Sequence, residues 1–255
     1  MLLAVDVGNT HITLGFYNSE RPYCHWRIST YRRGTADEYG ILLRQLFDSR
    51  GIALKEVSAV ALASVVPPLT GAFVEMAQRF FKVEPLVVGP GIKTGMPIRF
   101  DNPKEVGADR IVNGVAAFDK FGGPTIVVDF GTATTFDVIS AKGEYLGGAI
   151  APGIGISTDA LFSYAAKLPR VELVKPAQII GKNTVACMQS GIMFGLVGQV
   201  EGIVSRMKKE MNSPMLVVAT GGYSSLFEGE TDVVDRVEPF LTLEGLRLIY
   251  EMNKE

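Results

Sequence analysis

The feature that most constrains the fold of this chain is a short motif that occurs twice, about half a chain length apart. The first copy is Asp6–Thr10 (DVGNT) and the second is Asp129–Thr134 (DFGTAT). Each copy directly follows a short apolar run, Leu2–Val5 in the first case and Thr125–Val128 in the second, which predicts a buried strand ending in a turn. A chain that repeats a buried strand and its turn in this way is predicted to form two similar lobes.

The elements around the two copies repeat as well. Apolar runs bounded by turn residues predict strands at Leu2–Val5, Ile12–Tyr17, Tyr23–Ser29, Val57–Val66, Pro85–Val88, Thr125–Val128, Thr135–Ile139, Tyr145–Ile150 and Met215–Ala219. Capping residues and apolar periodicity predict helices that start after Thr35, at Pro67-Pro68, within Asn183–Met211 and within Leu241–Tyr250. The predicted fold class is therefore α/β, with two duplicated lobes of mixed sheets flanked by helices, at residues 1–118 and 119–255.

Composition excludes several classes of function. Among 255 residues, 25 are basic and 27 acidic, so the net charge is −2 and no basic block offers the charge that nucleic acid requires. Cys24 and Cys187 have neither disulfide-framework nor zinc-site spacing. The first residues lack the pattern of a signal peptide, and the uncharged stretches Val57–Val74 and Asn183–Val200 are interrupted by prolines or polar residues. We expect a cytoplasmic protein without nucleic-acid or membrane partners.

The two turns have the composition of a phosphate-binding site. Glycine allows a close approach to an anion, Asn and Thr side chains donate hydrogen bonds to phosphate oxygens, and an Asp at the strand end can hold a cation. Either copy alone is more typical of an ordinary hairpin turn, because its residues are common in turns. Recurrence at equivalent places favours a pair of turns that grips one polyphosphate. A Walker-type P-loop is absent, and Thr220-Gly221-Gly222, after a predicted strand, is either a place for a nucleoside or a geometric requirement of the turn.

The duplicated pattern resembles the superfamily of actin, sugar kinases and the ATPase domain of heat-shock chaperones, whose lobes are RNase H-like. Four motifs in order narrow this to a resemblance to type III pantothenate kinase: Asn102-Pro103, Gly107–Arg110, Asp129–Thr134 and Gly147–Gly153. The resemblance extends from Leu3 to the last predicted helix. It implies transfer of the γ-phosphoryl group of ATP to the primary hydroxyl of pantothenate, the first step towards coenzyme A, with Mg²⁺ and a monovalent cation, K⁺ or NH₄⁺.

The resemblance also implies roles for individual residues. Asp109 would be the general base, Asp6 would hold Mg²⁺ and Asp129 the monovalent cation. The residues matching ATP contacts are Asp6, Val7, Gly8, Asn9, Thr10, His11, Ile12, Thr13 and Thr132. Those matching pantothenate contacts are Phe100, Gly107, Ala108, Asp109, Arg110 and Thr184, of which Thr184 would come from the second subunit of a homodimer with shared active sites.

One departure from the family pattern concerns the pantothenate side. Phe100 stands where the family usually has a tyrosine, so the ring is kept and one polar contact is lost. His11 lies inside the first turn, within reach of ATP, but the base role is already assigned to Asp109. Two alternatives remain open: a phosphatase on the same fold, which the Gly107–Arg110 motif disfavours, and a non-catalytic ATP-binding regulator, which the retained Asp109 disfavours.

Overall fold

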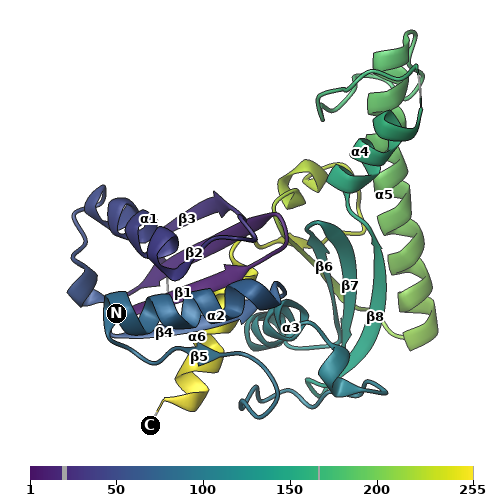
Figure 1. Ribbon diagram of the computed structural model, residues 1–255. Helices are drawn as coiled ribbons and strands as arrows, with labels where there is room; N and C mark the ends of the chain where they lie inside the picture. Colours follow the sequence, from purple (N-terminus) through teal and green to yellow (C-terminus); the bar gives the residue numbers. More distant parts are fainter. Residues whose placement is uncertain (19–21, 166, 255) are drawn as a thin grey trace. The chain divides into compact units, whose positions relative to one another are not determined.

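The structure is a computed structural model that describes residues 1–18, 22–165 and 167–254 (Figure 1). The chain forms two compact units, one made of Met1–Asp119 together with Leu241–Glu255 and the other of Lys120–Phe240. The first boundary lies next to the predicted division after residue 118. The last helix, which the sequence analysis left with the second lobe, is part of the first unit.

The first unit is built on a five-stranded mixed sheet. Its strands are β1 (Leu2–Val7), β2 (His11–Tyr17), β3 (Pro22–Ser29), β4 (Ala59–Ser64) and β5 (Leu86–Val87). Their spatial order is β3-β2-β1-β4-β5, with β1 antiparallel to β2 and parallel to β4. The carboxyl ends of β1 and β4 therefore lie at the same edge of the sheet, where the first phosphate turn follows β1.

Helices cover both faces of this sheet. The helices of the first unit are α1 (Ala36–Asp48), α2 (Pro67–Met76, continued by a π-helical turn, Ala77–Phe81), α3 (Ala108–Phe121) and α6 (Leu241–Asn253). α1 starts with the predicted capping box, in which Thr35 accepts from Glu38 N and the Glu38 carboxylate accepts from Thr35 N. α1 and α2 bury side chains such as Leu43, Phe47 and Phe73 against one face. α6 lies on the other face, where Leu243 packs on Gly15.

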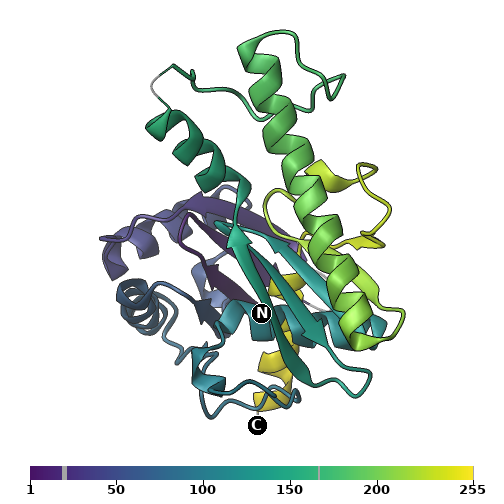
Figure 2. The same ribbon diagram turned by 90° about the vertical axis from the view of Figure 1, so that its right-hand side faces the viewer.

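The second unit repeats this design (Figure 2). Its strands are β6 (Thr125–Phe130), β7 (Ala133–Ile139), β8 (Tyr145–Pro152), β9 (Leu216–Thr220) and β10 (Arg236–Val237), in the order β10-β9-β6-β7-β8. β6 has the same length as β1 and the same order of buried and half-buried positions along the strand. β7 matches β2 in both respects. The predicted duplicated α/β fold is confirmed.

Two further helices complete the second unit, α4 (Ile154–Tyr164) and α5 (Thr184–Met211). α5 runs along one face of the sheet and buries Met193, Val200 and Val204 there, and both helices project past the end of the sheet (Figure 2). Asn183 caps α5 by accepting a hydrogen bond from Ala186 N at 2.9 Å, as its place before the predicted helical segment suggests. Short 3₁₀ turns occupy Leu54–Glu56, Pro103–Glu105 and Ser224–Phe227.

The length and apolar composition of α5 raise the question of whether it could span a membrane. Among the described helices, it alone is long and apolar enough to cross a membrane, and 39% of its most apolar stretch is buried in the protein. One such helix is weak support for a membrane span, because a helix packed against a protein core has the same properties. The side of α5 that faces the sheet belongs to the core of the second unit.

Candidate active site

The first phosphate turn joins β1 to β2 and is closed by its own backbone. Gly8 N donates to His11 O at 3.0 Å, and a Cβ on Gly8 would lie 2.9 Å from the same oxygen. Thr30, directly after β3, donates from Oγ1 to Gly8 O at 2.7 Å and from its backbone N to Thr10 O at 2.9 Å. The turn is thus held from both sides while Asn9 and Thr10 stay exposed to solvent. Asp6 lies half-buried near the end of β1.

The predicted base lies next to this edge of the sheet, within the first unit. Val65 follows β4 and donates from its backbone N to Val7 O at 3.1 Å, and a Cβ on Gly107 would lie 3.7 Å from Val65 Cγ1. Gly107 immediately precedes α3, and Asp109 occupies the first turn of that helix. The fold therefore brings Gly107–Asp109 beside the strand end from which the first phosphate turn leaves.

The carboxyl group of Asp109 is folded back over Gly107. A Cβ on Gly107 would lie only 2.5 Å from Asp109 Oδ1, and this oxygen accepts the Arg110 backbone N–H at 2.8 Å. Burial raises the pKa of Asp109 above its usual value, and the hydrogen bond from Arg110 and the Arg110 charge offset part of that rise. The side chain is thus a fixed carboxyl group with a raised affinity for a proton, which is the property that a general base needs.

The second phosphate turn is enclosed by two glycines of its own unit. Gly221, after β9, has φ +91°, and a Cβ there would lie 2.3 Å from Asp129 Oδ1. Gly153, after β8, donates to Thr132 O at 3.1 Å, and a Cβ there would lie 2.3 Å from that oxygen. Only glycine fits at either place, so the carboxylate of Asp129 and the backbone at Thr132 are held in place by direct contact.

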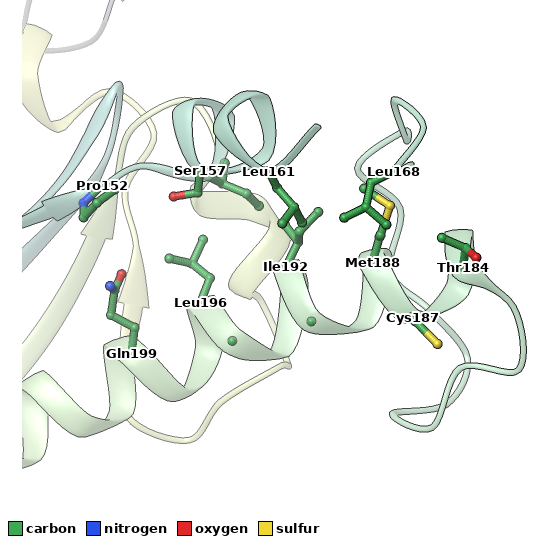
Figure 3. Close-up of a pocket in the computed structure, with 13 residues that line it drawn as sticks. Pro152, Ser157, Leu161, Leu168, Thr184, Cys187, Met188, Ile192, Leu196 and Gln199 are labelled. Atoms are coloured by element: carbon green, nitrogen blue, oxygen red, sulfur yellow. The ribbon is translucent and has the colours of Figure 1, made fainter. Parts of the chain in front are cut away.

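Thr184 lies apart from these turns, at the first residue of α5. It lines one end of a groove of about 550 Å³ between α4 and α5, and Pro152, the last residue of β8, lies at the other end (Figure 3). Leu161, Ile192 and Leu196 point towards one another across this groove. Phe100 lies in the loop before α3, in the first unit.

The carboxylates beside the two phosphate turns could hold a metal ion only if substrate phosphates supplied the remaining ligands. Within residues 1–18, 22–165 and 167–254, no group of three or more His, Cys, Asp or Glu side chains is arranged to hold a metal. Mg²⁺ is commonly bound by one or two carboxylates together with substrate phosphates. Single carboxylates beside phosphate turns, Asp6 in one unit and Asp129 in the other, fit this second manner of binding.

Four residues that contact the two turns were not assigned to them from the sequence: Gly153, Gly221, Arg27 and Arg32. Gly153 belongs to a family motif but had no role until the structure showed its contact with the Thr132 backbone. Gly221 was considered for a nucleoside, whereas in the structure it packs against Asp129. Arg27 and Arg32, which contact the first turn, were not identified, because isolated exposed arginines near strands are common and have no distinguishing spacing.

Comparisons with known proteins identify the family of this chain. The sequence profile of the type III pantothenate kinase family matches residues 2–206. The chain is 65% identical over 253 residues to the type III pantothenate kinase of Moorella thermoacetica, covering 99% of this chain and 100% of that protein. It is 56% identical to the enzyme of Geobacter sulfurreducens over the full length of both. The crystal structure of component A of (R)-2-hydroxyglutaryl-CoA dehydratase from Acidaminococcus fermentans has the same fold, with a TM-score of 0.56, 12% identity and 99% coverage of each chain. The chain belongs to the type III pantothenate kinase family.

Proposed function

We propose that this kinase, which phosphorylates pantothenate with ATP in the first step of coenzyme A biosynthesis, uses Asp109 as its general base. The observation that carries the proposal is the carboxyl group of Asp109, which is half-buried, accepts the Arg110 backbone N–H and lies over Gly107 beside the first phosphate turn, with a pKa raised by desolvation. Phosphoryl transfer depends mainly on positioning and on stabilisation of charge, and a carboxylate within hydrogen-bonding reach of the alcohol accepts its proton. A raised pKa strengthens that acceptance, provided that the group is ionised at the working pH.

ATP is assigned to the two turns. Asp6 and the residues that follow it (Val7, Gly8, Asn9, Thr10, His11, Ile12 and Thr13) surround the first turn, and Thr132 belongs to the second. Support comes from the exposed donors of the first turn and from the glycine contacts that fix the second. Asp6 would hold Mg²⁺, which supplies positive charge to the phosphate oxygens when it is bound.

Asp129 is assigned to a monovalent cation, K⁺ or NH₄⁺. A carboxylate beside a polyphosphate needs positive charge between the two anions, and the contact with Gly221 keeps this carboxylate in place. Replacing K⁺ by a large organic cation is expected to lower activity of the parent enzyme, and Asp129→Ala is expected to abolish the response to K⁺. Equal activity of the parent enzyme in both buffers would remove this assignment.

Pantothenate is assigned to Phe100, Gly107, Ala108, Asp109 and Arg110 of one subunit and Thr184 of a second. A planar guanidinium such as that of Arg110 suits a carboxylate or a developing phosphate charge. A second copy would cover the apolar surface around α4 and α5, where Tyr164 is 93% exposed and Ile180 76% exposed. We place this homodimer in the cytoplasm, without a membrane partner. We assign it no nucleic-acid partner either, because its net charge is −2.

The test is a coupled assay of ADP formation with ATP, Mg²⁺ and K⁺, in the presence and absence of pantothenate. The proposal requires ADP release only when pantothenate is present, together with a phosphorylated pantothenate detected by mass. Release of ADP and inorganic phosphate without pantothenate would instead favour a phosphatase on this fold. Tight ATP binding without turnover under either condition would favour a regulator.

A further inference from the structure

Two arginines from outside the first phosphate turn contact two of its polar side chains, His11 and Asn9. Arg27, near the end of β3, approaches His11 with 2.9 Å between the guanidinium Nη2 and His11 Nδ1. Arg32, in the loop after β3, donates from Nη2 to Asn9 Oδ1 at 2.9 Å. All four residues belong to the first unit. None of the family motifs that define the site includes either arginine.

The chemistry of a guanidinium group decides the direction of both hydrogen bonds. Arginine has only N–H donors, so the partner atom in each pair must be an acceptor. His11 Nδ1 is therefore unprotonated, which leaves a neutral ring with its proton on Nε2. The amide oxygen of Asn9 is occupied in the same way, which leaves its NH₂ group for another partner. Each arginine thus engages the acceptor atom of a turn side chain and leaves an N–H donor of that side chain for another partner.

The fold fixes Arg27 in this place. In the register of the sheet, Asp6 pairs with Thr13 and Thr13 pairs with Arg27, so the three residues form one row across β1, β2 and β3. Cross-strand partners point to the same face of a sheet, and His11 is the diagonal neighbour of Arg27 on that face. The segment after β3 is tied to the turn by both hydrogen bonds of Thr30.

The electrostatics of His11 agree with a neutral ring. Partial burial, and then the charge of Arg27, lower the pKa of His11 below its usual value. No acidic side chain contributes to this shift. At neutral pH the imidazole is therefore uncharged and acts through a single N–H.

We propose that Arg27 and Arg32 are positioning residues that make His11 and Asn9 hydrogen-bond donors towards the phosphates of ATP. This proposal depends on the assignment of ATP to the first turn. A phosphate group at neutral pH offers acceptors in every direction, so a turn whose acceptors are already occupied matches it, whereas a turn with free acceptors would repel it. The arginines act through their neighbours and not as ligands of their own.

The first test reads the tautomer directly in the protein without ligands. The chain has only two histidines, His11 and His25, so ring ¹⁵N spectra are simple, and a His25→Gln variant assigns them. The expected result for His11 at pH 7.5 is a protonated Nε2 and an unprotonated Nδ1. In Arg27→Met the expected spectrum is a mixture of tautomers, with a His11 pKa that moves back towards its usual value.

Adding Mg²⁺ and ATP without pantothenate separates this proposal from the one on which it depends. If His11 signals shift with ATP but the proton resides on Nδ1, the donor proposal is wrong and the ATP site stands. If the tautomer is as expected but ATP moves neither histidine, ATP does not bind at this turn, and both proposals are wrong. These measurements on the parent protein need no variant to fold.

The second test is kinetic. Arg27→Met and Arg32→Met are each expected to raise the KM for ATP about three- to tenfold and to change kcat by less than about twofold, because the lost interactions exist in both ground and transition states. Arg27→Lys keeps a donor and should recover most of the affinity.

Arg33→Met is the matched control. Arg33 is exposed beside Arg32, and in the described part of the chain it makes no hydrogen bond to Asn9 or His11. It should leave the KM for ATP unchanged. An equal rise in Arg33→Met and Arg32→Met would mean that positive charge alone attracts ATP, and would overturn the proposal for Arg32.

Discussion

Asp109 must be ionised to accept a proton, yet its surroundings favour the protonated form. Because its pKa is raised in the folded protein, the native state holds this proton more tightly than the unfolded chain does. The contribution of the protonated group to stability is complete below the usual carboxyl pKa, 3.8, and is lost as the pH rises through the higher native value. At neutral pH the enzyme therefore carries a group that reduces the stability of the native state in exchange for reactivity.

This leads to a prediction for Asp109→Asn, which keeps the shape of the side chain and removes the charge. Turnover should fall at least about 100-fold, because proton acceptance is lost, while the affinity for ATP stays the same. The melting temperature at pH 7 should be higher than that of the parent, and the difference should vanish near pH 4. Calorimetry at both pH values and a coupled assay give the two readouts. A loss of turnover below tenfold would show that Asp109 is not the base.

The contact between Gly107 and the Asp109 carboxyl predicts the effect of one added methyl group. In Gly107→Ala, the new Cβ would meet Asp109 Oδ1 at 2.5 Å, so the carboxyl group must leave its position while the backbone can stay in place. We expect kcat to fall about tenfold or more, with an unchanged KM for ATP and a folded protein by circular dichroism. Gly71→Ala, in α2 with no atom within 4 Å of the new Cβ, is the control and should remain fully active. Normal kcat in Gly107→Ala would disprove the positioning role of this contact.

At this scale, the sequence alone supplied little of the site. Asp109 followed from the family resemblance, since an adjacent Asp and Arg are by themselves more typical of a surface ion pair or of charges at a helix start. The direction in which Arg27 and Arg32 orient their neighbours depends on cross-strand register and on a loop conformation. Neither quantity is encoded in local residue spacing, so a sequence pattern could not reveal them.

At the scale of elements, the second phosphate turn depends on the first residue after β8. Gly153→Ala would bring a Cβ within 2.3 Å of Thr132 O and 2.5 Å of Gly131 O, both backbone atoms that a rotamer change cannot move. The turn must shift, at a cost of about 1–3 kcal/mol typical of overpacking. We expect the dissociation constant for ATP to rise more than about tenfold and the melting temperature to fall by several degrees.

Titration calorimetry with ATP and a thermal scan measure both effects, again with Gly71→Ala as the control. Unchanged ATP affinity in Gly153→Ala, with the substitution verified by mass, would show that this turn does not bind the nucleotide.

The elements that the sequence revealed are those with a strong local pattern. The capping box at Thr35, the long helix within Asn183–Met211 and the paired strands were predicted because each has a distinctive residue type or period. α3 was not predicted, although its sequence has an amphipathic pattern. α4 was missed because its pattern is weak, since it buries only Ile154 and Thr158. The place of α6 in the first unit was missed because a helical pattern does not identify the sheet that it covers.

At the scale of the whole molecule, the proposed shared site predicts complementation between two inactive variants. Chains with Asp109→Asn and chains with Thr184→Arg should each be inactive alone. Refolded together at equal amounts, half of the dimers are mixed, and each mixed dimer has one site with both defects and one with neither. Activity should return to roughly a quarter of the parent value.

Native mass spectrometry determines whether mixed dimers are present. If they are present and no activity returns, Asp109 and Thr184 act within one chain, because every site then keeps one defect. The parent protein refolded by the same procedure is the control for losses during refolding.

The membership of α6 in the first unit also affects the order in which the protein can form during synthesis. The second unit is continuous in sequence, from Lys120 to Phe240, and all of it leaves the ribosome before α6 does. The first sheet is made earliest, yet the face against which Leu243 packs stays uncovered until the last helix emerges. The unit translated second is therefore the first that can be completed. Until α6 is made, one apolar face of the first sheet stays exposed to solvent and to chaperones.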